Sequence, residues 1–401
     1  MNSLAEMSPL AVKSPFGGRK VVDIDTHYSE PRDLWTKRAP AKFKDRVPQI
    51  ATIDGQIWWV MDGRSMGMGG EGTSAIRKDG YKAPGADCLE LAFKDIHPGC
   101  TDPKARVALM DTCGVTAQIL YANVMGFGSK AANKADPELR LLSTKIYNDA
   151  MSELQEESGQ RIFPMALLPW WDCKAMVEEA LRAHEMGLRG VNINPEPFDF
   201  QDASGAFLPD LGHAHWNPFW EMVQSLDIPV NFHIGATTIG SATGHAWQSL
   251  PQRAQYKVMG YASYFGNART CANLVFSGLF DRYPKLKLVS VESGLGWVPF
   301  SMEYWDYMAA EGKFEKDFHM ERRPSEYMKS NIYTSFWFER KNVARDVKIV
   351  GVDNVMFETD FPHPQCLWPL DDVASAFAGL EEAEIAKVLS GNAIRLYKLP
   401  V

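Results

Sequence analysis

The chain has 401 residues, with 42 Lys and Arg against 50 Asp and Glu, and its formal net charge at neutral pH is −8. This length fits two average domains or one closed barrel with inserted loops, and a composition that is 45% hydrophobic allows a large core. The sequence contains no cluster of basic residues, so we do not expect the protein to bind nucleic acid or anionic membranes.

The cysteines and the N-terminal segment both favour an intracellular protein. The six cysteines are scattered and form no CxxC pair, which predicts reduced thiols rather than disulfides or a zinc finger. The first residues lack the apolar run of a secretory signal, and no segment is apolar enough to span a bilayer. We therefore expect a cytoplasmic protein whose residues 1–20 form a flexible arm.

Strand-like and helix-like segments alternate along most of the chain. The first strand is expected at residues 21–27, where apolar and polar side chains alternate. Residues 36–101 show little periodicity and are expected to form an insertion that contributes a lid or a subunit contact. Further strands are predicted at 115–121, 162–168, 190–194, 230–233, 286–291, 332–336 and 355–358. Helices are predicted at 174–186, 217–225, 267–281 and 343–349.

Eight strands separated by helices predict right-handed βαβ units and a parallel sheet that closes into a (β/α)8 TIM barrel. Residues 21–401 would then form a single domain, with the insertion after the first strand. Catalytic groups of such barrels lie at the C-terminal ends of the strands, where side chains from separate strands converge. The polar residues at the predicted strand ends are therefore the candidates for a functional site.

Metal-binding residue types collect at four of these strand ends, with Glu292 at the sixth. Asp25 and His27 end the first strand, and their two-residue spacing puts both side chains on one strand face. His233 ends the fifth strand, and Asp360 follows the eighth. One such histidine is more often structural, but the joint placement of two imidazoles and two carboxylates predicts a divalent-metal site. This donor set suits Zn, Mn or Fe(II) better than Ca or Mg, and we expect zinc.

His213 and His215 form a second candidate metal pair. They lie directly before Trp216, in an expected helix-entry loop rather than at a strand end. We therefore do not expect them to bind the ion.

Five segments of the chain resemble the amidohydrolase-2 family, which includes aminocarboxymuconate semialdehyde decarboxylase and aromatic acid decarboxylases. The segments are VVDIDTHYSEPRDLW, IPVNFHIG, VESGLGWVPF, FETDFPHPQCLWP and SGNAIRLYKL. Their order and spacing extend the resemblance over about residues 21–399. The resemblance implies a single divalent ion bound by Asp25, His27, His233 and Asp360.

The chain departs from this family pattern at two places. Its first-strand pair is Asp25-x-His27, whereas related decarboxylases often have His-x-His or Glu-x-His. At the sixth strand, Glu292-Ser293-Gly294 replaces a His-Gly-Gly-like motif whose histidine handles the proton in several decarboxylases. A bridging lysine, which holds two ions elsewhere in the superfamily, is also absent from the predicted strand at 190–194, and this favours one ion.

The departure at the sixth strand favours hydrolysis by a metal-activated water as the reaction. In that mechanism Asp360 is both ligand and proton acceptor, and Glu292 or His363 passes a proton to the leaving group. The alternative is nonoxidative decarboxylation of an aromatic or dienoic acid, which the family resemblance supports. A third reading, a binding barrel with a degenerate site, is opposed by the presence of all four ligand types.

Other residues are expected around the metal ion and the substrate. Glu30 and Glu358 are candidate ligands or supports for ligands, although Glu30 is equally explained as a charge near a helix start. A flat or bulky small-molecule substrate is expected to contact side chains that follow several strands, although packing against helices explains these aromatics equally well. These residues are Tyr121, Asn123, Trp170, Trp297 and Trp337. By analogy with relatives we expect a homodimer or a higher homo-oligomer.

Overall fold

The computed structural model describes residues 14–127, 132–133, 135–202, 204–237, 246–312, 320–370 and 373–401. Most of the predicted N-terminal arm, residues 1–13, therefore lies outside the described residues. The described end of that segment packs on the barrel, because the ring of Phe16 is buried and lies 5.7 Å from that of Phe357.

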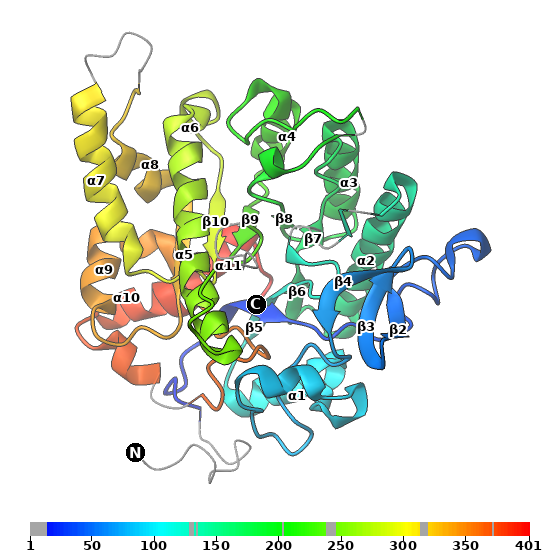
Figure 1. Ribbon diagram of the computed structural model, residues 1–401. Coiled ribbons are helices and arrows are strands. Elements are labelled where there is room, and N and C mark those ends of the chain that lie inside the picture. The colour runs from blue at the N-terminus through cyan, green and yellow to red at the C-terminus, as the bar shows by residue number, and fades with distance from the viewer. Residues whose placement is uncertain are drawn as a thin grey trace.

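Parallel strands form the predicted (β/α)8 barrel (Figure 1). The strands are β1 (Val22–His27), β5 (Ala117–Tyr121), β6 (Ile162–Pro164), β7 (Ala166–Leu167), β8 (Val191–Asn192), β9 (Val230–His233), β10 (Leu288–Val291), β11 (Ile332–Phe336) and β12 (Val355–Phe357). They pair in the order β1-β5-β6 and β7-β8-β9-β10-β11-β12. Each predicted strand is present, and the one expected at 162–168 is divided at Met165 into β6 and β7.

Backbone hydrogen bonds connect the two sheets into one ring. At the first seam, Met165 donates its N–H to Leu120 of β5, and the next residue, Ala166, donates to Gly190 before β8. At the second seam, the segment after β12 runs parallel to β1. There Asp360 donates its N–H to Asp25, and the N–H of His27 bonds to the carbonyl oxygen of the residue after Asp360. The second seam therefore joins two segments that carry predicted metal ligands.

Helices cover the outside of the barrel (Figure 1). They are α1 (Pro103–Cys113), α2 (Pro137–Glu157), α3 (Cys173–Glu185), α4 (Asn217–Leu226), α5 (Gln252–Phe276), α6 (Leu279–Arg282), α7 (Trp297–Gly312), α8 (Pro324–Asn331), α9 (Val343–Val350), α10 (Glu382–Ala386) and α11 (Asn392–Tyr397). The helix expected at 267–281 begins earlier, at Gln252. It ends at Phe276, because Gly278 adopts a φ of +68° that breaks the helix before α6.

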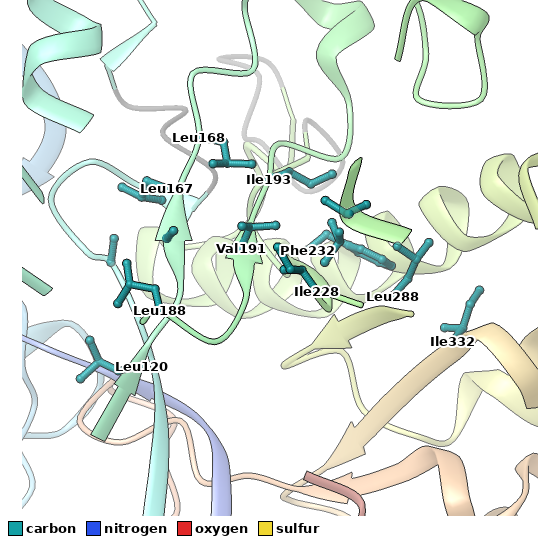
Figure 2. Packing of buried hydrophobic residues seen from close by; sticks show 14 of the residues in the cluster. Leu120, Leu167, Leu168, Leu188, Val191, Ile193, Ile228, Phe232, Leu288 and Ile332 are labelled. Atoms are coloured by element: carbon teal, nitrogen blue, oxygen red, sulfur yellow. The ribbon is translucent and has the colours of Figure 1, made fainter. Parts of the chain in front are cut away.

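Two apolar clusters hold the barrel together. The larger one lies between strands and helices, and Figure 2 shows Val191, Phe232 and Leu288 of successive strands in one layer of it. The smaller one fills the barrel interior and includes Tyr397 of the C-terminal helix. Its hydroxyl donates to Asn231 Oδ1 at 2.6 Å, so the chain end closes the interior beneath the strand ends that carry His27 and His233.

The predicted insertion contains a small antiparallel sheet that packs beside the barrel (Figure 1). Its strands are β2 (Gln49–Ile53), β3 (Gln56–Met61) and β4 (Arg64–Gly69), and β4 occupies the Gly- and Met-rich stretch. Trp59 of β3 is fully buried against Trp35, with 5.8 Å between the ring centroids. The insertion is therefore part of the packed fold rather than a structureless loop.

No described helix is long and apolar enough to cross a membrane.

Candidate metal centre

Four predicted ligands meet at the C-terminal mouth of the barrel. Asp25 and His27 come from β1, where residues two apart share a face, and His233 is the last residue of β9. Asp360 follows β12 with a φ of +59°, a left-handed conformation that non-glycine residues rarely adopt. This turn sits against β1, so the Asp360 carboxylate lies beside the other three side chains.

The distances between donor atoms match those around one metal ion. Asp25 Oδ1 lies 3.4 Å from His27 Nε2 and 3.3 Å from His233 Nε2, and His27 Nε2 lies 3.4 Å from Asp360 Oδ1. Two donors that bind one ion at about 2.1 Å and at a tetrahedral angle are about 3.4 Å apart. The side chains are at most 1% exposed. The site is therefore a compact, buried set of two nitrogen and two carboxylate donors.

Several of these donor atoms lack a hydrogen-bond partner among the described residues. Asp25 Oδ2, His27 Nε2 and Asp360 Oδ2 are buried without one. Buried polar atoms in native proteins nearly always have a partner, so a cluster of orphaned donors requires another ligand. A divalent cation can accept lone pairs from Asp25, His27 Nε2 and Asp360 together, and the residues present fit such an ion.

The imidazole of His233 is oriented for metal binding by the backbone. Its Nδ1 lies 2.8 Å from the carbonyl oxygen of Ile234, an acceptor that assigns the proton to Nδ1. The lone pair of Nε2 is then directed at Asp25 and the rest of the cluster. Burial alone would raise the pKa of Asp25, but the neighbouring His233 and His27 outweigh it and lower that pKa.

His363 connects Asp360 to Asn123. Its Nδ1 lies 2.7 Å from Asp360 Oδ1, and its Nε2 lies 2.8 Å from Asn123 Oδ1. The amide nitrogen of Asn123 donates to Tyr28 O, so its oxygen accepts a hydrogen bond from the Nε2–H group of His363. Burial lowers the pKa of His363 to about 3 and raises that of Asp360 to about 6. His363 is therefore neutral with its proton on Nε2, and its Nδ1 can accept a proton from Asp360 Oδ1 when that carboxyl group is protonated.

Further carboxyl groups surround the cluster. Glu292 Oε2 lies 3.5 Å from His233 Nε2, and burial together with the charges of Asp360 and Asp25 raises the pKa of Glu292 well above its usual value. Glu358 is buried behind it and accepts the Glu292 N–H at 3.2 Å. Glu292 can therefore act as a fifth ligand or as a proton-carrying group, whereas Glu358 orients Glu292.

Two four-residue combinations could each hold an ion, and in each set the ligand atoms lie within 4.8 Å of one another. The sets are Asp25, His27, His233 and Glu292, and His27, Glu292, Asp360 and His363. Because they share His27 and Glu292, they describe one centre with alternative ligands. His213 and His215, which we did not expect to bind the ion, belong to neither set.

A cavity of about 850 Å³ opens onto this centre. Glu292, Asp360, His363 and Asn123 form its polar end, and the rest of its described wall is largely apolar. The other described lining residues are Met66, Gly67, Thr73, Cys88, Gly126, Phe127, Ile234, Gly235, Gly260, Ser263, Tyr264, Pro364 and Gln365. A small, mainly apolar molecule with one polar end fits such a wall.

Of the five predicted substrate contacts, one lines the described part of the cavity wall and four do not. Asn123 lines the cavity, but four aromatic residues are not among the described lining residues. Tyr121 lies under His233 and bonds to Asn231, and Trp170 and Trp337 are buried at 1% and 2% exposure. Trp297, the first residue of α7, donates its indole N–H to the carbonyl oxygen of Ser293 in the preceding loop. These four side chains pack strands, helices and loops together.

Glu30 supports the site from a distance. Its carboxylate accepts the backbone N–H groups of Asn123 at 2.8 Å and Val124 at 3.2 Å, and it belongs to neither ligand set. It therefore holds the segment after β5 that carries Asn123.

The sequence analysis did not predict several of the residues that lie at the cavity. Met66 and Cys88 reach the cavity from the insertion, and Tyr264 reaches it from α5. Phe127 stacks on His233, with 3.9 Å between the ring centroids. None of these residues directly follows a predicted strand, so the strand ends did not point to them. The expected lid function of the insertion was the only sequence signal, and it concerns Met66 and Cys88.

Comparison with known proteins identifies the family. The sequence model described as amidohydrolase matches residues 22–399. The chain belongs to the amidohydrolase family. Gamma-resorcylate decarboxylase of Polaromonas sp. (strain JS666) is 30% identical over 304 residues, which cover 73% of this chain and 86% of that relative. The 2-amino-3-carboxymuconate-6-semialdehyde decarboxylase of Dictyostelium discoideum is 23% identical over 326 residues, 77% of this chain and 79% of the relative.

Two solved structures share the fold of this chain. An amidohydrolase from Mycobacterium avium subsp. paratuberculosis superposes with a TM-score of 0.73 at 24% identity and covers 94% of this chain and 98% of its own. A dihydroxybenzoic acid decarboxylase from Polaromonas sp. JS666, solved with manganese and 2-nitroresorcinol, gives a TM-score of 0.62 at 23% identity, covering 96% and 98%. These likenesses confirm the predicted barrel.

Proposed function

We propose that this amidohydrolase-family enzyme is a divalent-metal-dependent nonoxidative decarboxylase of an aromatic acid. The observation that carries the proposal is the cluster of Asp25, His27, His233 and Asp360 at the mouth of an apolar cavity, in a chain 30% identical to a gamma-resorcylate decarboxylase. This was the alternative reading of the sequence, and the relatives favour it over hydrolysis.

Asp25, His27, His233 and Asp360 would hold the ion, with Glu292 close enough to join them. When bound, a divalent cation would neutralise the acid and an adjacent hydroxyl oxygen of the substrate and make the ring a better electron acceptor. The mixed nitrogen and oxygen donors suit manganese and zinc alike. We propose one of these two metals rather than zinc alone.

The chain's own acid must supply a proton to the ring carbon that loses CO2. As that carbon–carbon bond breaks, its electron pair stays on the ring carbon, which takes a proton and becomes C–H. Asp360 lines the cavity, and its Oδ1 lies 2.7 Å from His363 Nδ1, close enough for a proton to pass between them. We assign Asp360 as the donor and His363 as the group that returns a proton to it, with Asn123 fixing the orientation of the imidazole. The apolar wall of Ile234 and Phe127 keeps bulk water away from the charged ring intermediate.

Hydrolysis is the second candidate because Glu292 lines the cavity at the place where several decarboxylases have a histidine. There it would protonate a leaving group while Asp360 takes the proton of the attacking water.

Product analysis in D2O distinguishes the two reactions. The metal-loaded protein is incubated with a panel of hydroxybenzoic acids and, separately, with aromatic amides and esters. Decarboxylation predicts release of CO2 and a product ring carrying deuterium at the carbon that lost the carboxyl group. Release of acid and amine or alcohol without CO2 would overturn the proposal and support hydrolysis.

A further inference from the structure

The cavity at the metal centre is much larger than a one-ring aromatic acid. Its volume is about 850 Å³, near the upper end of the range for sites that bind drug-sized molecules. A hydroxybenzoate has about 11 non-hydrogen atoms, and these fill roughly 330 Å³ even at the ~30 Å³ that a water molecule occupies in the liquid. More than half of the cavity is therefore left for a further part of the substrate.

The metal centre fixes one end of the cavity. Phe127 stacks on His233, and Thr73 accepts a hydrogen bond from the amide nitrogen of Asn123 at 3.2 Å. The oxygen of Asn123 lies 2.8 Å from His363 Nε2. These side chains enclose the place of the acid group and of the ring that carries it.

The remaining space lies between the insertion and α5, and we call it the outer chamber. Its walls are Met66, Gly67 and Cys88 of the insertion, Gly260 of α5 and Gln365 of the loop after β12. None of these residues belongs to either set of possible metal ligands. The outer chamber is therefore free to hold a part of the substrate that takes no part in the reaction.

Gly260 keeps the α5 wall of the outer chamber open. A Cβ atom at this position would have Gln365 Nε2 as its one described neighbour within 4 Å, at 3.4 Å, which is ordinary van der Waals contact. The residue lies inside a helix and has no positive φ, so the backbone does not require glycine there. Glycine is also a poor helix former. The missing side chain therefore serves the space of the outer chamber rather than the fold.

The outer chamber offers no partner to a second acid group. No lysine or arginine is among the described lining residues of the cavity, and both carboxyl groups among them belong to the metal centre. Beside Cys88, Asp87 is already paired with Arg253 of α5 at 2.9 Å. A charge buried without a partner is destabilised, whereas apolar atoms gain from burial. The outer chamber therefore suits a neutral, mainly apolar group.

We propose that the substrate is an aromatic monocarboxylate with two rings, or with one ring and an apolar group of similar size, whose second part occupies the outer chamber. Gly260 determines this size limit. The inference rests on the proposed decarboxylation and adds the size and charge of the substrate to it. The acid group stays at the metal centre, so the second ring strengthens binding and leaves the bond that breaks unchanged.

Binding of reaction products separates substrate size from catalysis. The probes are phenol, 3-phenylphenol and 4-phenylphenol, which lack a carboxyl group and cannot react, and calorimetry measures their binding to the manganese-loaded protein. At least one phenylphenol should bind about 30-fold more tightly than phenol, because its second ring buries roughly 100 Å² of apolar surface. If both phenylphenols bind no more tightly than phenol, the inference is wrong.

Gly260→Leu should remove this preference. Its side chain fills the outer chamber, so the preference for the phenylphenol over phenol should fall about tenfold, and Gly260→Ala should lower it less. Alanine favours the helix more than glycine does, so Gly260→Ala decides the question if the leucine variant fails to fold. Ala262→Leu on the same helix is the matched control, because Ala262 is not among the described lining residues. A preference that neither Gly260 variant changes would overturn the role of Gly260.

A charged outer ring tests the expected neutrality of the second part. A sulfonate on the outer ring of 4-phenylphenol should weaken binding at least tenfold, and Gln365→Lys should restore it by supplying the missing cation. If the sulfonated and the neutral compound bind the wild-type protein equally well, the restriction to one acid group is wrong.

Turnover distinguishes this inference from the proposed function. Release of CO2 is measured from 2-hydroxybenzoate and from its 4-phenyl and 5-phenyl derivatives, and one phenyl derivative should have the highest kcat/KM. If 2-hydroxybenzoate is used better than both derivatives, the larger substrate is wrong and decarboxylation stands. If no acid releases CO2 while a phenylphenol binds tightly, decarboxylation is wrong and the size limit set by Gly260 stands.

Discussion

Thr359 donates both its backbone N–H and its hydroxyl to the carboxylate of Asp23, at 2.9 and 2.6 Å. Asp23 lies on β1 two residues before the predicted ligand Asp25, and Thr359 directly precedes Asp360. One buried carboxylate therefore ties together the two segments that carry three of the four ligands. Arg106 supports the same seam by donating to the carbonyl oxygen of His27 at 2.6 Å.

Asp23→Asn should weaken metal binding. The amide nitrogen of asparagine accepts no hydrogen bond, so one of the two hydrogen bonds from Thr359 is lost and the segment carrying Asp360 should shift relative to β1. Loss of a group that orients metal ligands typically costs 10- to 100-fold in metal affinity. Competition with a metal-binding dye measures this, with Asp54→Asn in an exposed turn as the control. If Asp23→Asn binds the metal with unchanged affinity, then the Asp23 carboxylate does not help to position the metal ligands.

His233→Ala should abolish stoichiometric metal binding. The variant removes one of four donors and leaves Asp25 without its neighbour at 3.3 Å. Metal analysis after desalting should show about one ion per wild-type chain and little in the variant, and a chelator should abolish wild-type activity. His213→Ala is the matched control and should keep the metal. Full metal content and activity in His233→Ala would contradict the assignment of this centre.

Asp360→Asn separates proton transfer from metal binding. The amide keeps an oxygen donor but carries no transferable proton, so kcat for decarboxylation should fall by about 10²- to 10⁴-fold while part of the metal is retained. Glu292→Gln should have a smaller effect on kcat in decarboxylation. If Glu292→Gln lowers kcat as much as Asp360→Asn does, with the metal retained in both, the proton donor is Glu292.

Glu30 should make stability depend on pH. Burial raises its pKa to about 7 from a usual value of 4.5, against the opposing effect of the N–H groups of Asn123 and Val124. The folded chain then binds more protons than the unfolded chain between these values. The stability that Glu30 contributes is therefore present below pH 4.5 and lost as pH rises to about 7.

Glu30→Gln should remove this dependence, since glutamine does not titrate. From pH 4.5 to pH 7 its unfolding free energy should rise relative to wild type, by at most about 3 kcal/mol. Urea unfolding at several pH values measures the difference, and Glu156→Gln at an exposed helix position controls for loss of a negative charge. If the difference in unfolding free energy between Glu30→Gln and wild type is constant from pH 4.5 to pH 7, then the pKa of Glu30 is not raised in the folded protein.

Short-range patterns explain why so much of the site was predictable. Alternating apolar residues predict strands such as β9 and β11, whose observed bounds are the predicted ones, because strand formation depends on burial of successive side chains. In a parallel barrel every strand points the same way, so residues at strand ends must meet. Asp25, His27, His233 and Asp360 could therefore be brought together by topology alone. The predicted helix at 267–281 was placed less well, because α5 is partly polar and shows no single apolar stripe where it begins.

The amino-acid sequence by itself determined the barrel and predicted the four ligands, since both depend on local periodicity and on the common direction of the strands. It determined the family through five segments that resemble it. Only the tertiary structure decided which residues face the cavity: it brought in Met66 and Cys88 from the insertion and left Trp170 and Trp337 in the packing. The physical reason is that the orientation of a loop or helix side chain depends on contacts distant in sequence. Such contacts produce no periodic pattern in the sequence.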